Sequence, residues 1–479
     1  MRYDTVIVGG GAAGGILAAR AAEDPERSVL LMEAGPDFGP TAEGQPPDVI
    51  DADDPGPTDY DWGLEAELGA LGRRSPVFAG RLLGGSSATN NVMALRGRPA
   101  DYDAWASAGN HGWSYEEVLA DFAAVERDLD FGGDAWHGYA GPVPICRPDE
   151  PAPVQQAFRD ACVAAEHPPV ADHNAPGAVG VGPLPLNQIG GVRQSTALTC
   201  LATARRRPNL TIRSGATADR VVIDRGRALG VRSVGPGEEI EADRVVLAAG
   251  AYGSPAVLLR SGIGPADHLR TLGIPVAVDL PGVGANLHDH PLLRLRYASR
   301  GPVSVPPRQM LLTTDSGLQI FPSGPEDGEL VLLVALLVPH SRGRLRLRSP
   351  DPRTPPDIDV GLLRAPEDAP PLADGLHQAR RLARTPPLAR FVDDELWPGD
   401  TTDVNDALRE GLNVYQHPVG TCRMGPPDDP YAVVDPSGHV RGLEGLLVAD
   451  ASVMPTVPRA NTHLPTLMLA EHLAARLGQ

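Results

Sequence analysis

A glycine-rich turn near the N-terminus constrains the fold more strongly than any other part of the sequence. The apolar segment 5–8 runs into Gly9-Gly10-Gly11-Ala12-Ala13-Gly14, and the residues after it, 14–22, are predicted to form a helix. A second apolar segment, 29–32, ends at Glu33. A strand, a tight glycine turn, a helix and a second strand form the opening unit of a Rossmann-type α/β fold. We therefore predict a parallel sheet that begins with these segments.

The glycine spacing is typical of a loop that binds the pyrophosphate of a dinucleotide. Gly9 permits the tight turn, Gly11 lets the backbone approach the pyrophosphate, and Gly14 allows close packing of helix on strand. The pyrophosphate would lie at a helix N-terminus, and Glu33 has about the spacing expected for a ribose-binding acid. The segment 262–267 is the nearest candidate for a second loop, but it follows no predicted strand and lacks the third glycine. The sequence therefore favours one dinucleotide, either FAD or NAD.

Length and charge limit the classes of protein that remain. A chain of 479 residues is too long for one ordinary core, so we expect two domains. The net charge is 42 − 61 = −19, which argues against nucleic-acid partners and against docking on anionic lipid. The four cysteines form no CxxC pair, and we expect no metal site.

The sequence carries no pattern of a leader or a membrane span. Met1-Arg2-Tyr3-Asp4 leads directly into the first predicted strand, without the apolar core of a signal peptide. The longest aliphatic run, 330–338, is much shorter than the roughly 20 residues of a membrane-spanning helix. We expect a cytoplasmic protein, with peripheral membrane association through a partner left open.

Apolar runs in the region 292–345 predict a second sheet. They alternate or are continuous over strand-like lengths, which is typical of an antiparallel sheet, and they lie at 292–297, 318–321, 330–338 and 344–347. The chain ends in a predicted helix over 464–477. The fold class that we predict is α/β, α+β overall, with a Rossmann-like dinucleotide domain and a second, substrate-binding domain on an antiparallel sheet.

Two histidines late in the chain supply the residue type needed for proton chemistry. They occur in His417-Pro418-Val419-Gly420-Thr421 and in Asn461-Thr462-His463-Leu464-Pro465-Thr466. Oxidation of an alcohol requires loss of the hydroxyl proton and of a hydride from carbon. A histidine with a pKa near neutrality is suited to take the proton. Either His417 or His463 is the expected base, and the other would orient the alkoxide.

The sequence resembles the glucose–methanol–choline (GMC) oxidoreductases, which bind FAD. The likeness rests on four blocks that follow the family's order through nearly the whole chain. They are the glycine loop with Glu33-Ala34-Gly35, the segment 80–105 containing Gly84-Gly85-Ser86-Ser87-Ala88-Thr89-Asn90, the segments 250–264 and 283–290, and the segment 417–425 with 450–452 and 461–466. The resemblance implies a flavin fold of the p-hydroxybenzoate-hydroxylase type and an active-site pair at His417 and His463.

The resemblance also implies how the cofactor is held. Some members attach FAD covalently to a histidine in the second block, and Thr89 occupies that position here, so we expect non-covalent FAD. Residues 1–150, 190–290 and 430–479 are expected to form the FAD-binding domain, and 151–189 and 291–429 the substrate-binding domain. Together with the glycine loop, the resemblance predicts cofactor contacts from Gly9, Gly11, Ala12, Ala13, Gly14, Glu33, Ala34, Arg81, Gly84, Gly85, Ser86, Asn90, Val221, Gly250, Asp450, Ala451, Thr462, Pro465 and Thr466.

Several functions are compatible with these motifs. The leading hypothesis is an FAD-dependent alcohol dehydrogenase, with an oxidase as the alternative and either oxygen or a respiratory chain as electron acceptor. The compact length resembles the mycofactocin-associated branch, whose substrate would be a reduced, peptide-derived redox cofactor. Choline or a simple alcohol is another substrate, and the low aromatic content, 4%, disfavours a cage for choline. A hydroxynitrile lyase with a redox-idle flavin and a non-enzymatic flavin-binding partner or sensor are the remaining alternatives.

Overall fold

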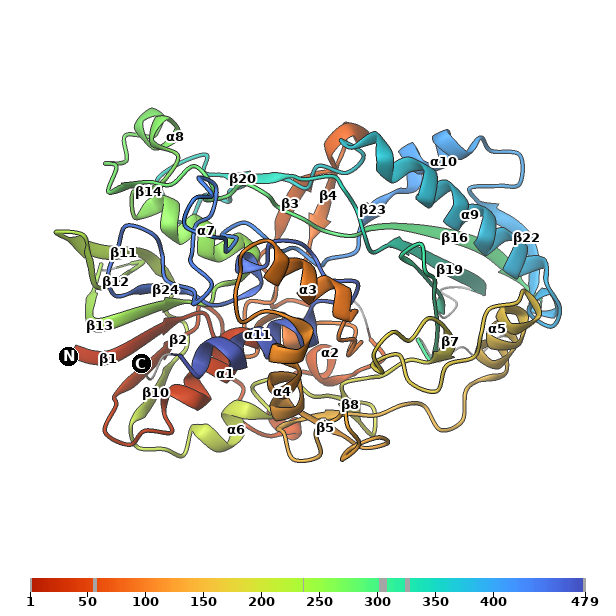
Figure 1. The fold of residues 1–479 in the computed structure, drawn as a ribbon, viewed down its shortest axis with the longest axis horizontal. Coiled ribbons are helices and arrows are strands. Elements are labelled where there is room, and N and C mark those ends of the chain that lie inside the picture. The colour runs from red at the N-terminus through yellow and green to blue at the C-terminus, as the bar shows by residue number, and fades with distance from the viewer. Residues whose placement is uncertain (1, 55–57, 236, 301–307, 324–327, 477–479) are drawn as a thin grey trace.

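Two large β-sheets, one mostly parallel and one antiparallel, organise the fold in the computed structural model of the chain (Figure 1). The structure describes residues 2–54, 58–235, 237–300, 308–323 and 328–476. The first sheet lies on the left of Figure 1 and the second on the right, with helices and loops between them.

The first sheet confirms the predicted Rossmann-type unit. Its strands follow the order β10-β2-β1-β13-β12-β11, and β24 also pairs with β13. The pairs β10–β2, β2–β1, β1–β13 and β13–β24 are parallel, whereas β11, β12 and β13 form an antiparallel edge. The strands are β1 (Arg2–Val8), β2 (Val29–Met32), β10 (Leu210–Arg213), β11 (Ala218–Asp224), β12 (Arg227–Ser233), β13 (Glu239–Leu247) and β24 (Leu446–Val448).

Helices from both ends of the chain pack beside this sheet. Helix α1 (Ala12–Ala21) follows the glycine loop and packs against the C-terminal helix α11 (His463–Ala474), which also contacts α4 (Tyr115–Val125). Helix α7 (Gly250–Arg260) follows β13 directly. The loop after β1 and the last helix are thus neighbours although more than 400 residues separate them in sequence.

The second sheet is antiparallel, as predicted, and each of its faces packs into a different core. Its order is β22-β16-β19-β18-β17-β7, with β23 paired to β16. Along β19, even-numbered residues such as Leu332 join the main core, where α5 and α9 cover the sheet. Odd-numbered residues such as Leu333 join a second cluster on the opposite face. The elements are β7 (Gly180–Pro183), β16 (Pro291–Ser299), β17 (Met310–Thr313), β18 (Leu318–Ser323), β19 (Glu329–Leu336), β22 (Val392–Trp397), β23 (Asn413–Val414), α5 (Pro153–Ala164) and α9 (Ala369–Arg384).

One predicted strand of this sheet belongs elsewhere. The run at 344–347 forms β20 (Arg344–Arg346), which pairs with β21 (Asp357–Asp359) in a four-stranded sheet of order β20-β21-β3-β4. Strands β3 (Leu64–Glu67) and β4 (Arg74–Val77) come from a part of the chain for which no strand is predicted from the sequence. This sheet therefore joins an early segment to a late one. Strand pairing between distant segments leaves no local sequence signal.

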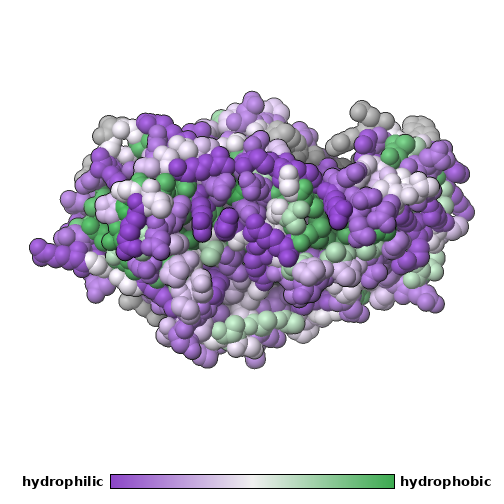
Figure 2. Space-filling view, turned by 90° about the horizontal axis from the view of Figure 1, so that it is seen from above, coloured by the Kyte–Doolittle hydropathy of each residue, from purple (hydrophilic) through white to green (hydrophobic). Residues whose placement is uncertain are grey.

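Shorter elements complete the chain and link these layers. They are α2 (Pro47–Ile50), α3 (Pro99–Ser107), α6 (Cys200–Ala204), α8 (Ala266–Thr271), α10 (Val404–Gly411), β5 (Glu126–Asp128), β6 (Val143–Ile145), β8 (Gln188–Ile189), β9 (Val192–Arg193), β14 (Ile263–Gly264), β15 (Val278–Asp279) and the 3₁₀ helices η1 (Ala42–Gly44), η2 (Gly69–Leu71), η3 (Gly85–Ala88), η4 (Pro366–Asp368), η5 (Leu388–Arg390) and η6 (Ala451–Val453). On the face seen in Figure 2, hydrophilic residues dominate and hydrophobic ones are exposed in small groups.

Within the described ranges, the structure contains no helix that combines the length and the apolar character needed to cross a bilayer.

Candidate active site

Two glycine loops meet backbone against backbone at the start of α1. The Gly84 N–H donates to the Gly10 carbonyl at 2.8 Å. A Cβ added to Gly85 would lie 2.6 Å from the Gly11 Cα, and one added to Gly14 would lie 1.8 Å from the Gly9 carbonyl oxygen. Only glycine allows these approaches. The structure therefore brings the first and second sequence blocks into one surface, including the predicted residues Gly9, Gly11, Ala12, Ala13, Gly14, Gly84, Gly85 and Ser86.

This surface fits the pyrophosphate of a dinucleotide. Helix α1 begins at Ala12 with Gly11 as its N-cap, and it has neither a side-chain cap nor an acidic residue in its first turn. Its first N–H groups have no partner within the helix, and they favour a bound anion. Thr196, which sequence reasoning missed, donates from Oγ1 to the Gly11 carbonyl at 3.2 Å and so fixes the loop from behind.

The carboxylate of Glu33 ties the loops around the end of β2 together. Its Oε2 accepts the Gly10 N–H and its Oε1 accepts the Gly35 N–H, both at 2.8 Å. Burial raises the pKa of Glu33, and these backbone hydrogen bonds oppose that rise. A hollow of about 510 Å³ opens beside it. The lining residues are Ala34, Gly35, Pro36, Asp37, Asp59, Tyr60, Asp61, Arg81, Ser214 and Gly215.

Two more of the predicted cofactor contacts, Val221 and Asn90, make hydrogen bonds within the chain. Val221 is buried in the middle of β11, outside the lining of the hollow, and its N–H donates to the Ser261 hydroxyl at 2.8 Å. Asn90 accepts the Val92 N–H on its side-chain oxygen at 2.9 Å, and Val92 has a positive φ of 51°. Asn90 thereby shapes the turn that follows the second glycine loop.

Asp450 joins the third and fourth sequence blocks. Its Oδ2 accepts the Gly250 N–H at 2.8 Å and the Ser254 hydroxyl at 2.5 Å, and its Oδ1 accepts the Ser452 N–H at 2.8 Å. Burial raises the pKa of Asp450. The next residue, Ala451, accepts the Gly420 N–H at 3.3 Å and so holds the segment that contains His417.

Helix α11 places the second predicted histidine at its first position. His463 follows the N-cap Thr462, and the helix has no side-chain cap and no acidic residue in its first turn. Pro465 lies in that first turn, and the Thr466 hydroxyl donates to the Thr462 carbonyl at 2.7 Å. His463 Nε2 lies 3.3 Å from Asn187 Oδ1. Since the amide nitrogen of Asn187 donates to the Pro144 carbonyl, its oxygen accepts from His463 Nε2–H.

His417 lies between a histidine and an asparagine. Its Nδ1 is 2.9 Å from Nδ1 of His290, and its Nε2 is 3.1 Å from Nδ2 of Asn461. The same amide nitrogen lies 3.4 Å from the sulfur of Met93, which can only accept. The hydrogen-bond network therefore assigns Asn461 as donor to His417 Nε2, which carries the lone pair, while His417 Nδ1–H donates to His290.

Burial keeps these imidazoles neutral. His417 is 7% exposed, and burial together with the neighbouring His290 holds its pKa well below the ordinary histidine value. Burial also lowers the pKa of His463 to about 4 and that of His290 to about 3. A neutral imidazole with a free lone pair is the form that accepts a proton. His290 ends the segment 283–290 of the third sequence block, and its Nδ1 is the hydrogen-bond partner of His417.

An apolar wall stands beside His417. The Tyr415 ring lies 4.2 Å from the His417 ring, centroid to centroid, and stacks at 6.2 Å on Phe321 of β18. Tyr415, Phe321 and Met93 belong to the second hydrophobic cluster, on the sheet face opposite α5 and α9. Gln319 lies two residues before Phe321 and therefore on the same face. It is fully buried, and neither polar atom of its amide has a hydrogen-bond partner among the residues that the structure describes.

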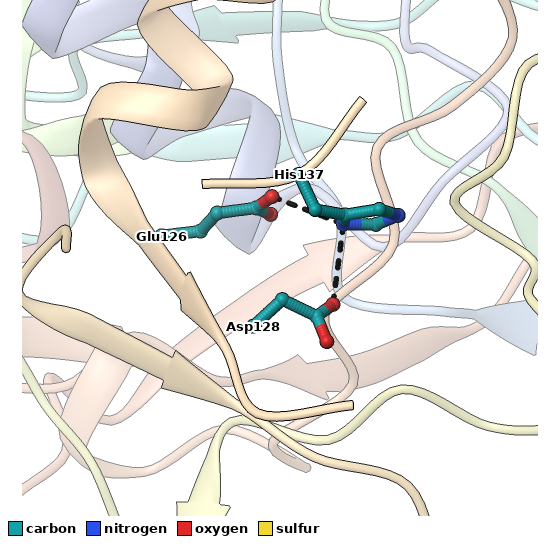
Figure 3. A group of neighbouring side chains, drawn as sticks. All are labelled: Glu126, Asp128 and His137. Carbon is teal, nitrogen blue, oxygen red and sulfur yellow. Dashed lines mark hydrogen bonds and ion pairs between the residues drawn. The ribbon is translucent and has the colours of Figure 1, made fainter. Parts of the chain in front are cut away.

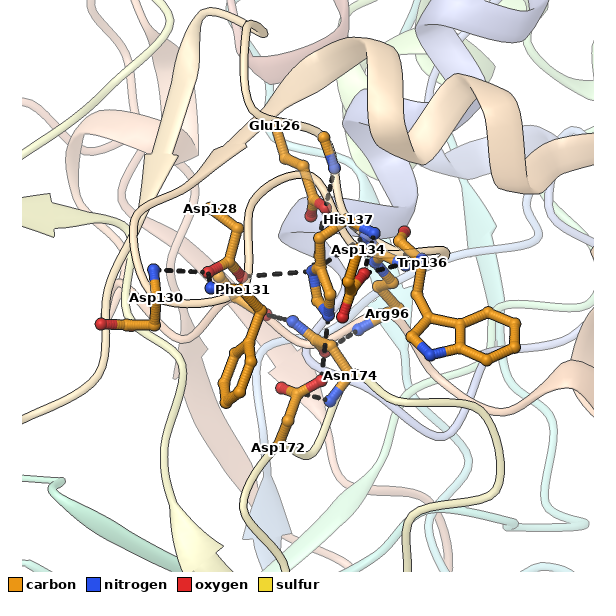
Figure 4. Close-up of polar contacts among 12 residues, drawn as sticks. Arg96, Glu126, Asp128, Asp130, Phe131, Asp134, Trp136, His137, Asp172 and Asn174 are labelled. Carbon is orange, nitrogen blue, oxygen red and sulfur yellow. Dashed lines mark hydrogen bonds and ion pairs between the residues drawn. The ribbon is translucent and has the colours of Figure 1, made fainter.

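A second buried histidine centre lies apart from this site. Glu126, Asp128 and His137 place ligand-type atoms within 4.8 Å of one another, which is the donor set of a candidate metal site (Figure 3). Beside them, Arg96 Nη2 binds Glu126 (Figure 4). Arg147 Nη1 binds Asp128 at 2.6 Å.

The charges of this centre balance without a metal ion. His137 Nε2 lies 3.0 Å from Asp172, and Arg147 Nη2 binds the other oxygen of Asp172 at 2.6 Å. Burial disfavours the imidazolium of His137, but hydrogen bonds to Asp128, Asp172 and Glu126 outweigh that effect and raise its pKa to about 11. Three buried carboxylates thus face two guanidinium groups and one imidazolium, and the partly exposed Asp130 lies 3.4 Å from Arg147 at the edge of this ion-pair network.

Comparison with known proteins identifies the class. The GMC oxidoreductase N-terminal profile matches residues 3–292, and the C-terminal profile matches residues 339–470. The chain is 39% identical to a 5-(hydroxymethyl)furfural oxidase of Methylovorus sp., with 98% of each chain covered. It is 34% identical to an oxygen-dependent choline dehydrogenase of Chromohalobacter salexigens, over 99% of this chain and 94% of that one. Among solved structures, pyridoxine 4-oxidase from Mesorbium loti superposes with a TM-score of 0.94 at 34% identity, with 99% of each chain covered.

The chain belongs to the GMC oxidoreductase family. The family and its flavoprotein neighbours indicate FAD as the cofactor, and the paired glycine loops and the uncapped start of α1 fit that dinucleotide.

Proposed function

We propose that this chain oxidises a hydroxymethyl group on an aromatic ring, with His417 as the base. The observation that carries the proposal is the arrangement of His417: its Nδ1 is fixed by His290, its Nε2 retains the lone pair, and its ring lies against Tyr415. A buried neutral imidazole beside an apolar wall suits removal of a proton from an alcohol held on that wall.

The chain's own residues would divide the work in this way. His417 Nε2 accepts the hydroxyl proton, and His290 holds the ring in the required tautomer. Asn461, which donates to the same Nε2, exchanges that contact for the substrate oxygen. His463, at the start of α11, orients the alkoxide once its Nε2–H leaves Asn187 for the substrate oxygen. FAD, when bound, supplies the acceptor for the hydride that leaves the alcohol carbon.

The wall and the relatives support an aryl alcohol as the substrate class. Stacked Tyr415 and Phe321 form a flat apolar surface, and the unpartnered amide of Gln319 on the same sheet face offers one hydrogen-bonding position for a polar substituent. Two of the relatives are named for 5-(hydroxymethyl)furfural and pyridoxine, both of which are hydroxymethyl compounds of aromatic rings. Reoxidation of a peptide-derived redox cofactor such as reduced mycofactocin has no comparable support in the site.

The cofactor is proposed to be non-covalent FAD, bound by residues 1–150, 190–290 and 430–479, while 151–189 and 291–429 hold the substrate. Thr89, at the position of the family's flavin-tethering histidine, has no nitrogen with which to form the bond. The contacts proposed are those predicted above, centred on the two glycine loops, the surroundings of Glu33 and Asp450, and the start of α11. Oxygen is the proposed acceptor, because the relatives are named oxidases or oxygen-dependent.

The experiment is anaerobic addition of alcohols to the purified yellow protein, followed by its visible spectrum. Benzyl alcohol and 5-(hydroxymethyl)furfural should bleach the flavin band, whereas choline should not. Readmitted air should restore the band within seconds if oxygen is the acceptor. Bleaching by choline alone would overturn the substrate class, and a flavin that no alcohol bleaches but that accompanies cleavage of mandelonitrile would favour the lyase. Acid precipitation should leave free FAD in the supernatant; yellow precipitate would contradict non-covalent binding.

A further inference from the structure

Four arginines of the described ranges are buried, and three of them have strong partners. Arg147 binds Asp128 and Asp172, each at 2.6 Å, and Arg96 binds Glu126 and the carbonyl oxygen of Trp136. Arg193 donates to the carbonyl oxygens of Asn90 and Asp54 at 2.8 Å, of Ala88 at 3.2 Å, and of Val49. Each of these guanidinium groups therefore has a structural explanation.

Arg308 is the exception. It is 4% exposed, and among described residues its guanidinium makes one hydrogen bond, from Nη2 to the Ala52 carbonyl at 3.3 Å. It forms no ion pair within 4.0 Å with any described carboxylate. Asp53 and Asp54 are exposed and act on it only at longer range. Burial lowers the pKa of Arg308 to about 10, so the group remains charged at neutral pH.

The guanidinium lies on the substrate side of the candidate active site. Ala52, which accepts its hydrogen bond, belongs to the same hydrophobic cluster as Tyr415, Met93 and Phe321. Arg308 also acts electrostatically on Tyr415, whose ring contacts His417. It precedes β17 by two residues, and β17 contributes Leu311 to this cluster.

A buried cation with no carboxylate partner among the described residues is costly, and a guanidinium is shaped to receive a carboxylate in two parallel hydrogen bonds. We propose that Arg308 binds a carboxylate of the substrate, so that this enzyme acts on aryl alcohols that also carry an acid group. The inference rests on the proposed oxidation of an aryl alcohol. It also predicts discrimination against choline, because a quaternary ammonium would meet the like charge of Arg308.

The test compares two alcohols of nearly equal size, 4-(hydroxymethyl)benzoate and 4-(hydroxymethyl)benzamide, by kcat/KM. The parent should prefer the acid by about 10-fold or more, as a charge-assisted hydrogen bond predicts. Arg308→Gln should abolish that preference, mainly by raising KM for the acid, and Arg308→Lys should retain part of it. The exposed Arg225→Gln should keep the parental ratio.

Two further measurements distinguish carboxylate binding by Arg308 from a structural role of Arg308 and from an effect on the rate of turnover. Arg193→Gln, which removes several backbone contacts, should lower the thermal midpoint, whereas Arg308→Gln should not. Benzoate, which cannot be oxidised, should perturb the flavin spectrum of the parent and not that of Arg308→Gln. Equal loss on both alcohols in Arg308→Gln, or a parent without preference for the acid, would overturn the proposal. If neither alcohol bleaches the flavin, the proposed function fails, and benzoate binding still decides whether Arg308 receives a carboxylate.

Discussion

Two buried histidine centres in this molecule have opposite protonation behaviour. His137 contacts Glu126, Asp128 and Asp172, and its pKa rises to about 11 despite burial. His417 contacts His290 and Asn461, and its pKa falls well below the ordinary value. Burial acts in the same direction on both, so the charge of the neighbours decides the outcome.

The difference separates a structural role from a reactive one. An imidazolium held by carboxylates has no lone pair to offer, and its proton is part of the ion-pair network that joins the segment 126–147 to Asp172. A neutral imidazole whose ring contacts only uncharged side chains keeps a lone pair and can receive a proton during a reaction. A buried histidine that stays neutral, with its pKa shifted by its surroundings, is typical of catalytic sites.

The largest effect should come from removing the neutral imidazole. His417→Ala should keep its flavin but slow flavin reduction by an aryl alcohol about 10²- to 10⁴-fold, the usual contribution of general-base catalysis. Anaerobic stopped-flow absorbance measures this rate directly. His340→Ala, at an exposed histidine, is the control and should reduce at the parental rate. A parental rate in His417→Ala would show that His417 is not the base.

Local sequence signals predicted the elements around the cofactor loop. A strand, a glycine turn and a helix follow one another in sequence, so their geometry is encoded within about 30 residues, and β1, α1 and β2 appear as expected. The sheet β20-β21-β3-β4 had no such signal. Its early and late strands are short, and nothing in either segment specifies the other.

The sequence motifs indicated which residues form the candidate site, but not which of them contact one another. His417 and His463 stand in motifs, and the structure places them close to Asn461 and Asn187 respectively. The role of His290 depends on a contact between residues 127 positions apart. The burial of Arg308 depends likewise on Ala52, 256 positions away. Such contacts arise only when the tertiary fold is formed.

The second-largest effect should come from disrupting the ion-pair network around His137. His137→Gln should lower the free energy of unfolding by about 3 kcal/mol, because it leaves buried carboxylates without their cation. Chemical denaturation followed by tryptophan fluorescence measures this, and the rate of flavin reduction in the folded variant should stay parental. His439→Gln is the matched control, because His439 pairs with Asp435 at the surface at 3.4 Å and should contribute little. Equal free energies of unfolding for His137→Gln and the parent would show that His137 does not stabilise the fold through this network.

The smallest expected effect, taken per pH unit, is on the free energy of unfolding as the pH changes. The pKa of His137 is raised from about 6.5 when unfolded to about 11 when folded. The contribution of His137 to the free energy of unfolding is therefore fully present below pH 6.5 and is lost progressively as the pH rises toward 11. Between these values the folded state holds a proton that the unfolded state has released, so stability should fall by up to about 1.4 kcal/mol per pH unit.

His137→Gln lacks this proton, so the difference in unfolding free energy between parent and variant should shrink from pH 7 to pH 9.5. Flavin reduction should behave differently over neutral pH, because the depressed pKa of His417 keeps that imidazole neutral well below pH 6.5. Protonation of His417 should thus add no inflection near 6.5 to the substrate-reduction rate, and should lower that rate only as the pH drops further toward its folded pKa. A constant stability difference across the alkaline range would mean that His137 is neutral in the native protein. The two histidine centres would then no longer differ in charge.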